Sequence, residues 1–252
     1  MVSDDRVVLV TGASRGIGRA AATQFAERGA TVIVHYAVNE AAAKQTLTGL
    51  PGTGHLAMSA DLTDADAVAE LVAQVVAIRG RIDVLVNNAG IYEAHPVLST
   101  GYDEWRESWR RTLETNLVGP ANLIHEVVPH MVAQGGGRIV NVSSRGAFRG
   151  EPECPAYGAS KAGLNSLGQS LAQALAPHGI YITTVAPGFV ATDMAAEILD
   201  GPRGDGIRGQ SPMQRVATAD EIARVIVFLA EPGAETTTGA IVDVNGASYL
   251  RT

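Results

Sequence analysis

Short apolar runs alternate with helical patterns along the chain. Seven runs are rich in Val and Ile and are apolar on both faces more often than alternating: Val7–Val10, Thr31–His35, His55–Ser59, Ile82–Val86, Arg138–Val142, Tyr181–Val185 and Ala240–Val244. This pattern is typical of parallel strands that are covered on two sides. Apolar residues recur at helical spacing between the runs, as in Ile17–Arg28 and in the segment after the potential N-cap Asp64. Because strand and helix alternate, the sequence predicts an α/β fold with one doubly wound parallel sheet of about seven strands and helices on both faces.

The composition agrees with one domain that spans residues 1–252. The chain has 252 residues, of which 46% are hydrophobic and 18% are charged, so it can bury a large core. No linker, repeat or low-complexity tract divides it. The net charge of −7, with no basic tract, argues against nucleic acid or an anionic membrane as a partner.

Cysteine usage and the N-terminal pattern indicate the compartment. The single cysteine, Cys154, excludes an internal disulfide, and the histidines show no ligand spacing, so no metal is expected. No apolar run approaches the ~18 residues of a membrane span, and the acidic N-terminus lacks the pattern of a signal peptide. We therefore expect a cytoplasmic protein.

A glycine-rich turn, Thr11–Gly18, joins the first strand-like run to the first helical pattern. Gly12 permits a tight turn, Gly16 lets the backbone approach a pyrophosphate, and Gly18 lets the helix pack closely against the strand. The free N–H groups and the positive end of that helix would face the phosphates. The turn therefore predicts a dinucleotide site at the carboxyl ends of the strands, and an ordinary glycine-rich βα turn is the alternative.

Three further motifs follow in register. Asn87–Gly90 comes after the fourth run, Tyr157–Lys161 lies in the helical segment Ala156–Leu175, and Pro187–Gly188 comes after the sixth run. Together with the glycine turn, they resemble the short-chain dehydrogenase/reductase family over the whole chain, including its 3-oxoacyl reductase-like members. The resemblance implies a Rossmann-type fold, a nicotinamide cofactor and a homo-oligomer, either a tetramer or a dimer.

The resemblance also implies a set of cofactor contacts at the strand ends. These are Gly12, Ser14, Arg15, Gly16, Ile17, Gly18, Tyr36, Asp61, Leu62, Asn88, Ala89, Gly90, Tyr157, Lys161, Pro187, Gly188, Val190 and Thr192. The end of the second run, His35–Asn39, contains no acid, and Arg15 could pair with a ribose 2′-phosphate. NADP is therefore favoured, with NAD held through Tyr36 and backbone groups as the alternative. A helix-capping role is the alternative for Asp61.

Reduction of a ketone requires a proton donor besides the hydride, and Tyr157 and Lys161 lie four residues apart on one helix face. We expect the Lys161 ammonium, together with the positive nicotinamide ring of the oxidised cofactor, to favour the phenolate and lower the pKa of Tyr157 from its ordinary value near 10. By resemblance, Ser144 bonds the substrate oxygen and Asn116 holds a water for a proton relay. The ordinary alternatives are a surface Tyr–Lys pair, a strand-end turn at Ser144 and a polar helix residue at Asn116.

The remaining segments suggest the surroundings of the site. A short helix at Asp193–Leu199 and the Gly- and Pro-rich stretch Gly201–Pro212 resemble the substrate lid of the family, at about residues 190–212, although an ordinary surface loop is the alternative. The loop residues Arg145, Phe148 and Arg149 after Ser144, and Ile91, Tyr92 and His95 after the fourth run, are expected to edge the pocket. Arg145 and Arg149 are expected to be solvated, and recognition of an anionic substrate is the alternative. A helical pattern from Tyr102 is expected to continue towards Leu117.

These observations predict an NADP-dependent oxidoreductase that transfers a hydride between nicotinamide and a ketone or secondary alcohol. A 3-oxo compound or a 3-oxoacyl thioester is a possible substrate, although Ala133–Gly137 and Ala172–Ala174 lack the basic residues with which such family members dock an acidic carrier. An NAD-dependent alcohol dehydrogenase is one alternative. A catalytically silent nucleotide-sensing protein is another, but it need not retain Asn116, Ser144, Tyr157 and Lys161.

Overall fold

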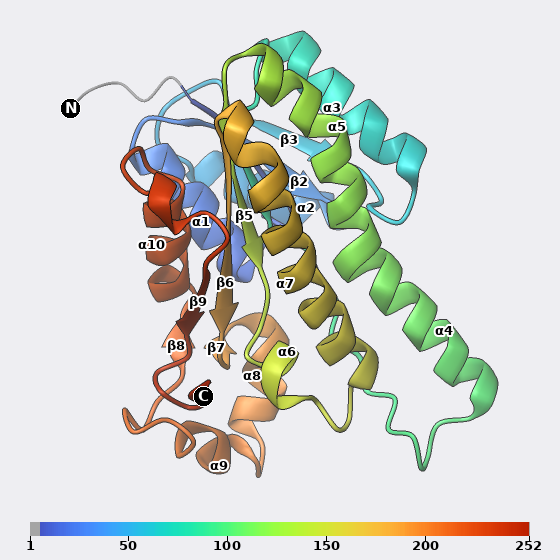
Figure 1. Cartoon of the computed structure of the whole chain (residues 1–252). Helices are drawn as coiled ribbons and strands as arrows, with labels where there is room; N and C mark the ends of the chain where they lie inside the picture. The colour runs from blue at the N-terminus through green and yellow to red at the C-terminus, as the bar shows by residue number, and fades with distance from the viewer. Residues whose placement is uncertain (1–5, 252) are drawn as a thin grey trace.

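Seven strands form one parallel sheet at the centre of the protein. In this computed structural model, which describes residues 6–251 without the side chains at positions 193, 194, 197 and 198, the strand order is β3-β2-β1-β4-β5-β6-β9 (Figure 1). The strands are β1 Val7–Val10, β2 Thr31–Tyr36, β3 Leu56–Ser59, β4 Val84–Asn87, β5 Gly137–Val142, β6 Ile180–Pro187 and β9 Ile241–Val244. The order reverses between β1 and β4, which is where sheets of this type bind ligands.

Helices cover both faces of the sheet (Figure 1). Helices α1, α2 and α10 pack on one face, and α3, α5 and α7 pack on the other. The helices are α1 Gly16–Glu27, α2 Glu40–Gly49, α3 Ala65–Arg79, α4 Tyr102–Leu113, α5 Gly119–Ala133, α6 Gly146–Arg149, α7 Pro155–Leu175, α8 Asp193–Asp200, α9 Gly204–Arg208 and α10 Ala219–Leu229. A small parallel pair, β7 Val190–Ala191 and β8 Ala217–Thr218, lies beyond the main sheet.

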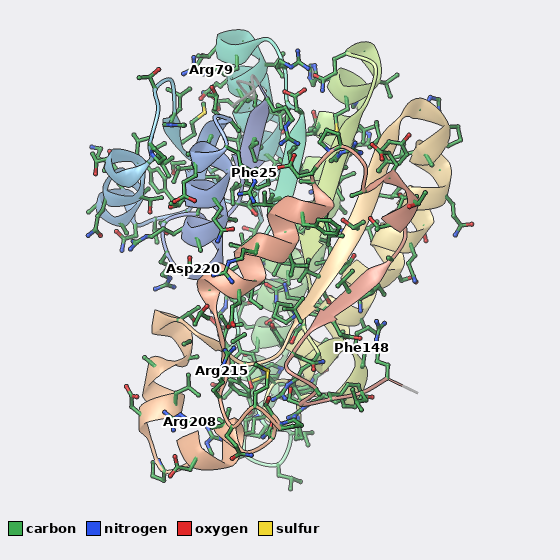
Figure 2. All side chains as sticks on the ribbon, turned by 90° about the vertical axis from the view of Figure 1, so that its left-hand side faces the viewer. Phe25, Arg79, Phe148, Arg208, Arg215 and Asp220 are labelled. Atoms are coloured by element: carbon green, nitrogen blue, oxygen red, sulfur yellow. The ribbon has the colours of Figure 1, made fainter. Side chains whose placement is uncertain are left out.

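Two apolar cores lie between the helices and the sheet. Along β1, Val8 and Val10 contribute to one core, whereas Val7 and Leu9 contribute to the other. Phe25 of α1 is fully buried in the first core (Figure 2). Because both faces of the strands are covered, their sequences are apolar at nearly every position.

The predicted sheet and helices are confirmed, with strand boundaries that agree within two residues. Asp64 caps α3 as expected, because its side chain accepts hydrogen bonds from the backbone N–H groups of Asp66 (2.9 Å) and Ala67 (3.3 Å). None of the helices within residues 6–251 is long and apolar enough to cross a membrane.

The helix that was expected to continue from Tyr102 towards Leu117 changes its geometry before it ends. Helix α4 passes into a π-helical turn, Glu114–Val118, and then into α5. Such turns often occur at functional sites, because they alter the direction of side chains within a continuous helix. Asn116 lies in this turn and is fully buried.

Candidate active site

A cavity of about 570 Å³ opens at the carboxyl ends of the strands. It extends from the glycine turn after β1 to Tyr157 and Lys161 on α7. Predicted site residues that line it are Gly12, Ser14, Arg15, Gly16, Ile17, Tyr36, Asp61, Leu62, Asn88, Ala89, Gly90, Ser144, Tyr157, Lys161, Pro187, Gly188, Val190 and Thr192. Gly18 and Asn116 are not among the lining residues. The fold thus brings nearly all of the predicted positions to one cavity.

The glycine turn has a backbone that side-chain-bearing residues rarely adopt. Gly12 and Gly16 have φ angles of 61° and 55°. Gly18 supports the turn from behind, because a Cβ atom there would collide with the carbonyl oxygen of Gly12. No side chain caps α1, and its first turn contains no acidic residue. The exposed backbone N–H groups and the positive end of α1 therefore fit the phosphates of a dinucleotide.

His35, at the end of β2, holds this turn in place. The backbone N–H of Gly12 donates a hydrogen bond to His35 Nδ1 (3.2 Å), and His35 Nε2 lies 3.0 Å from the carbonyl oxygen of Ala60. Because Nδ1 accepts, the proton of the neutral ring is assigned to Nε2, which donates to Ala60. Burial lowers the pKa of His35 to about 4. Sequence reasoning missed this role, and the available signal was a histidine within an otherwise apolar strand.

We expect the neutral His35 ring to make folding stability depend on acidity. The pKa of His35 falls from 6.5 to about 4 on folding, so the unfolded chain binds the extra proton between these values. This contribution is fully present above pH 6.5 and is lost as the pH falls towards 4. Urea unfolding at pH 7 and pH 4.5 should show a stability loss that is roughly 2–3 kcal/mol larger for the wild type than for His35→Asn. An equal loss in both proteins would contradict this role.

Asn88 and Thr11 join the loop after β4 to the glycine turn. Asn88 Nδ2 donates to the carbonyl oxygens of Thr11 (2.9 Å) and Gly12 (3.3 Å). Thr11 Oγ1 accepts hydrogen bonds from the backbone N–H groups of Asn88 (2.9 Å) and Ala89 (3.0 Å). The Asn88 amide group thus shapes the wall of the cavity.

Asp61, after β3, uses only one of its two carboxylate oxygens in local hydrogen bonds. Its Oδ1 accepts hydrogen bonds from the backbone N–H and the hydroxyl of Thr63, both at 2.9 Å. The residue is exposed and lines the cavity. Asp64, rather than Asp61, caps α3. Asp61 therefore retains acceptor capacity towards the cavity.

Tyr157, Lys161 and Ser144 converge at the other end of the cavity. Lys161 Nζ lies 5.8 Å from the centre of the Tyr157 ring and donates to the carbonyl oxygen of Val142 at 2.8 Å. The Tyr157 hydroxyl is hydrogen-bonded to Ser144, whose Oγ accepts from the backbone N–H of Gly146 at 3.0 Å. Helix α7 positions the phenol and the amine, and the end of β5 positions the serine.

Burial has the largest effect on the pKa values of Tyr157 and Lys161. It raises the pKa of Tyr157 to about 12, against the opposing effect of the hydrogen bond to Ser144. It lowers the pKa of Lys161 to about 8. The predicted lowering of the Tyr157 pKa by Lys161 together with the oxidised nicotinamide ring stays a prediction, because it concerns the cofactor-bound protein; in the chain alone, burial has the largest effect on this phenol. Tyr157 is protonated at neutral pH, as a proton donor must be.

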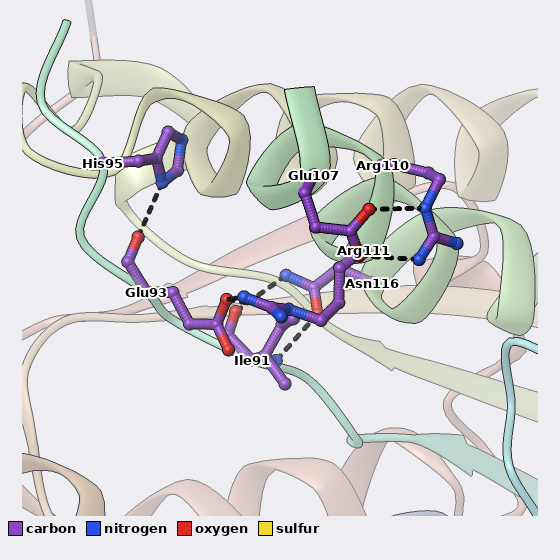
Figure 3. Close-up of polar contacts among 7 residues, drawn as sticks. All are labelled: Ile91, Glu93, His95, Glu107, Arg110, Arg111 and Asn116. Carbon is purple, nitrogen blue, oxygen red and sulfur yellow. Dashed lines mark hydrogen bonds and ion pairs between the residues drawn. The ribbon is translucent and has the colours of Figure 1, made fainter. Parts of the chain in front are cut away.

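Asn116 fixes the loop that follows β4 (Figure 3). Its Oδ1 accepts from the backbone N–H of Ile91 (2.8 Å), and its Nδ2 donates to the carbonyl oxygen of Ile91 (3.0 Å) and to Ser160 Oγ (3.2 Å). A Cβ atom on Gly90 would lie 3.1 Å from Asn116 Oδ1 and 3.4 Å from Lys161 Nζ. Asn116 therefore sits directly behind the cavity wall beside Lys161, with its amide group already hydrogen-bonded.

The same loop is attached to α7 through His95, which was expected at the edge of the pocket but is not among its lining residues. His95 Nδ1 lies 2.8 Å from the carbonyl oxygen of Glu93, and Nε2 accepts from the backbone N–H of Ala156 at 3.2 Å (Figure 3). Ala156 directly precedes Tyr157, so His95 sets the start of the helix that carries the phenol. A second contact, the ion pair between Glu93 and Arg111 (2.5 Å), holds the loop against α4.

The expectation that Arg145 is solvated is wrong. Arg145 is only 3% exposed. Its guanidinium donates to Ser248 Oγ (2.5 Å) and Gln210 Oε1 (2.6 Å), and it lies 5.2 Å from the centre of the Phe189 ring. These contacts attach the loop after β5 to the segment after α9, through Gln210, and to the segment after β9, through Ser248. The described residues contain no group of three or more His, Cys, Asp or Glu side chains that could hold a metal ion.

Comparison with known proteins identifies the family. Residues 12–247 match the family described as enoyl-(acyl carrier protein) reductase. The chain is 37% identical to a 3-oxoacyl-[acyl-carrier-protein] reductase of Staphylococcus epidermidis, over 98% of this chain and 100% of that protein. It is 40% identical to an L-rhamnose 1-dehydrogenase (NAD(P)(+)) of Azotobacter vinelandii, over 99% of both chains. A reductase of Thermotoga maritima with the same name as the first is 38% identical, over 98% of this chain and 99% of that protein.

The chain therefore belongs to the short-chain dehydrogenase/reductase family. It is an NAD(P)-dependent oxidoreductase that acts on a ketone or the corresponding alcohol. The cavity agrees with this activity, because the glycine turn and a buried phenol–amine pair open into the same space.

Proposed function

We infer that the protein is an NADP-dependent reductase of ketones in which Tyr157 is the acid. The observation that carries this proposal is the buried, protonated Tyr157 beside Ser144 and Lys161, in a cavity that continues to the glycine turn. A bound nicotinamide cofactor supplies the hydride. The cradle at Gly12 and Gly16, with the uncapped start of α1, fits its pyrophosphate.

The chain itself supplies the proton and the positioning. Ser144 donates a hydrogen bond to the substrate oxygen, and Tyr157 transfers its phenolic proton to that oxygen as negative charge develops there. The Lys161 ammonium stabilises the phenolate that Tyr157 leaves, and it also bonds the cofactor ribose. Asn116 holds the loop beside Lys161 and a water through which the proton is replaced.

The remaining predicted positions hold the other parts of the cofactor. Asp61 and Leu62 contact the adenine, and Asn88, Ala89 and Gly90 line the ribose side. Val190 and Thr192, with Pro187 and Gly188, contact the nicotinamide carboxamide. All of these residues line the cavity, which supports the assignment.

NADP, rather than NAD, fits the mouth of the cavity. Arg15 is exposed at this mouth, and the lining segment Tyr36–Asn39 contains no acid that would repel a 2′-phosphate. Asn39 is committed to capping α2, since its side chain accepts from the backbone N–H of Ala42 at 2.9 Å. Arg15 is therefore the group assigned to the 2′-phosphate.

Replacing Arg15 by Ala should weaken NADPH binding selectively. Loss of a charge-assisted contact to phosphate should raise the Kd for NADPH by about tenfold or more, whereas the Kd for NADH should change little. Fluorescence titration of both cofactors measures the two constants. Equal weakening of both would contradict the NADP assignment and would favour an NAD-dependent alcohol dehydrogenase.

The activity is tested by a panel of carbonyl compounds, followed through the loss of reduced-cofactor absorbance with both nicotinamides. The panel includes a simple ketone, a 3-oxoacyl thioester and, in the oxidation direction, free sugars. Turnover of at least one compound with NADPH supports the proposal. Tight NADPH binding without turnover across the panel would instead favour a silent nucleotide-sensing protein.

Three further assignments accompany this function. Residues 190–212 form a substrate lid of a single domain, 1–252, and Gln210 of this segment already contacts Arg145 beside the cavity. The protein is a homo-oligomer, a tetramer or a dimer, since apolar Tyr102, Val118 and Val132 are exposed along α4, the π-helical turn and α5. It works in the cytoplasm on a small molecule, which agrees with a buried unpaired Cys154.

Light scattering tests the oligomeric state. We expect a mass of two or four times the 26.2 kDa of the chain. A mass of a single chain at micromolar concentration would contradict the assignment.

A further inference from the structure

The substrate end of the cavity contains a carboxylate whose hydrogen-bonding capacity is unused. Glu151 follows α6 and lines the cavity, and its side chain is only 12% exposed. Its nearest ionic partner is Arg149, with Nε 3.7 Å from Glu151 Oε1, which is beyond hydrogen-bond distance. Among the described residues no donor lies within hydrogen-bond distance of this carboxylate. Its oxygens are not among the buried atoms that lack a partner, so they face the cavity, where a donor from a bound molecule can reach them.

The Glu151 side chain packs against Gly146 and lies near the predicted catalytic residues. A Cβ atom on Gly146 would lie 2.6 Å from Glu151 Oε1, so a larger residue at position 146 would require the Glu151 side chain to move. Glu151 lines the cavity together with Tyr157 and Tyr92, and its charge raises the pKa of both phenols. It therefore lies near the phenol that protonates the substrate.

The other polar groups at this end are already engaged. The Tyr92 hydroxyl is hydrogen-bonded to Cys154, and its ring contacts the Tyr157 ring edge-on at 4.9 Å between centres. Arg145 is held by Ser248 and Gln210. Glu151 thus offers an acceptor to the part of a substrate next to the reacting carbon.

The charges around Glu151 restrict the chemistry of that substrate. A second carboxylate or a phosphate placed against Glu151 would be repelled by it. An ammonium group would be repelled by Arg145 and Arg149, the two cations that act on Glu151, while Glu153 is the other acid that acts on it. A neutral hydroxyl can donate a hydrogen bond to the carboxylate, and it is repelled neither by Glu151 nor by the two arginines. Ile91, Tyr92 and Phe189 line the same cavity and offer apolar surface to the C–H face of a ring.

We propose that Glu151 is a specificity-determining residue that accepts a hydrogen bond from a substrate hydroxyl next to the reacting carbon. The substrate class is then a neutral polyhydroxylated compound, such as a sugar or a cyclic polyol in its oxidised or reduced form. A simple ketone or an acyl thioester lacks the hydroxyl that this site holds. This inference rests on the proposed function, because Glu151 selects the substrate that Tyr157 protonates.

Two ring ketones that differ by one hydroxyl test the proposal. The ratio of kcat/KM for 2-hydroxycyclohexanone to that for cyclohexanone is measured with NADPH for the wild type, Glu151→Gln and Glu151→Leu. Comparing this ratio between proteins removes the intrinsic difference in reactivity of the two ketones. A hydrogen bond to a charged group predicts that Glu151→Leu lowers the ratio by about tenfold or more. Glu151→Gln keeps an acceptor oxygen and should lower the ratio less.

The control is Glu153→Gln, since Glu153 is an exposed acid that pairs with Arg203 at 3.0 Å, outside the cavity. This variant should keep the wild-type ratio. An unchanged ratio in both Glu151 variants, or a wild-type preference for a 3-oxoacyl thioester over 2-hydroxycyclohexanone, would overturn the inference and leave the reductase assignment intact. Failure of the wild type to reduce any carbonyl compound would instead overturn the proposed function, and this inference with it.

Discussion

Replacing Tyr157 by Phe should reduce ketone reduction by about 10²–10⁴-fold while leaving NADPH binding intact. The phenol is buried and its pKa is raised to about 12, so at neutral pH it holds the proton that the substrate oxygen needs. Phe keeps the ring, including its edge contact with Tyr92, and removes only the hydroxyl. Initial rates of NADPH loss and a fluorescence titration of NADPH, both on the purified variant, measure the two quantities.

Tyr102→Phe provides the matched control, because it also removes a phenolic hydroxyl, but from a residue outside the cavity. Tyr102 lies on α4 and is 75% exposed. It should retain wild-type turnover. If Tyr157→Phe keeps turnover within a few-fold of wild type, another group supplies the proton and the assignment of the acid is wrong.

Replacing Lys161 by Met should also abolish most turnover, by about 10²-fold or more, without lowering the stability of the fold. The ammonium is buried beside Tyr157, and burial lowers its pKa to about 8. Because the unfolded chain keeps the ordinary value of 10.5, the buried charge costs stability below pH 8, and this cost fades as the pH rises towards 10.5. Met at position 161 carries no charge, so it removes the free-energy cost of burying the ammonium. It cannot, however, stabilise the phenolate of Tyr157. Initial rates and urea unfolding at pH 7 separate the two effects.

The same ionisation predicts a pH profile for the wild type. The ammonium form predominates below about pH 8, so kcat/KM for reduction should fall as the pH rises through this value. Lys161→Arg, which stays charged, should shift that fall to higher pH. A wild-type profile that stays flat to pH 10, or full activity in Lys161→Met, would contradict the role of Lys161.

The parts of the structure that could be predicted from sequence depend on local patterns. The strands are apolar at nearly every position because helices cover both faces of the sheet, and this pattern located them within two residues. The glycine turn was recognisable because its conformation favours glycine at positions 12 and 16. Spacing along one helix placed Tyr157 and Lys161 on the same side of α7.

The parts that could not be predicted depend on contacts between distant segments. His35 supports Gly12 and Ala60 across two loops, and no local pattern distinguishes it from any histidine in a strand. Arg145 is buried because Gln210 and Ser248 reach it from far along the chain. The raised pKa of Tyr157 follows from its degree of burial, which the four-residue spacing to Lys161 does not specify.

The central claim is that a hydride passes from nicotinamide to a carbonyl carbon while Tyr157 supplies the proton. It is tested most directly with NADPH that carries deuterium at the transferred position of C4, incubated with wild-type protein and a ketone from the panel that is turned over. Mass spectrometry of the alcohol should find deuterium on the carbinol carbon in the wild-type reaction and almost no product with Tyr157→Phe. An alcohol without deuterium, or equal deuterated product from both proteins, would contradict the account.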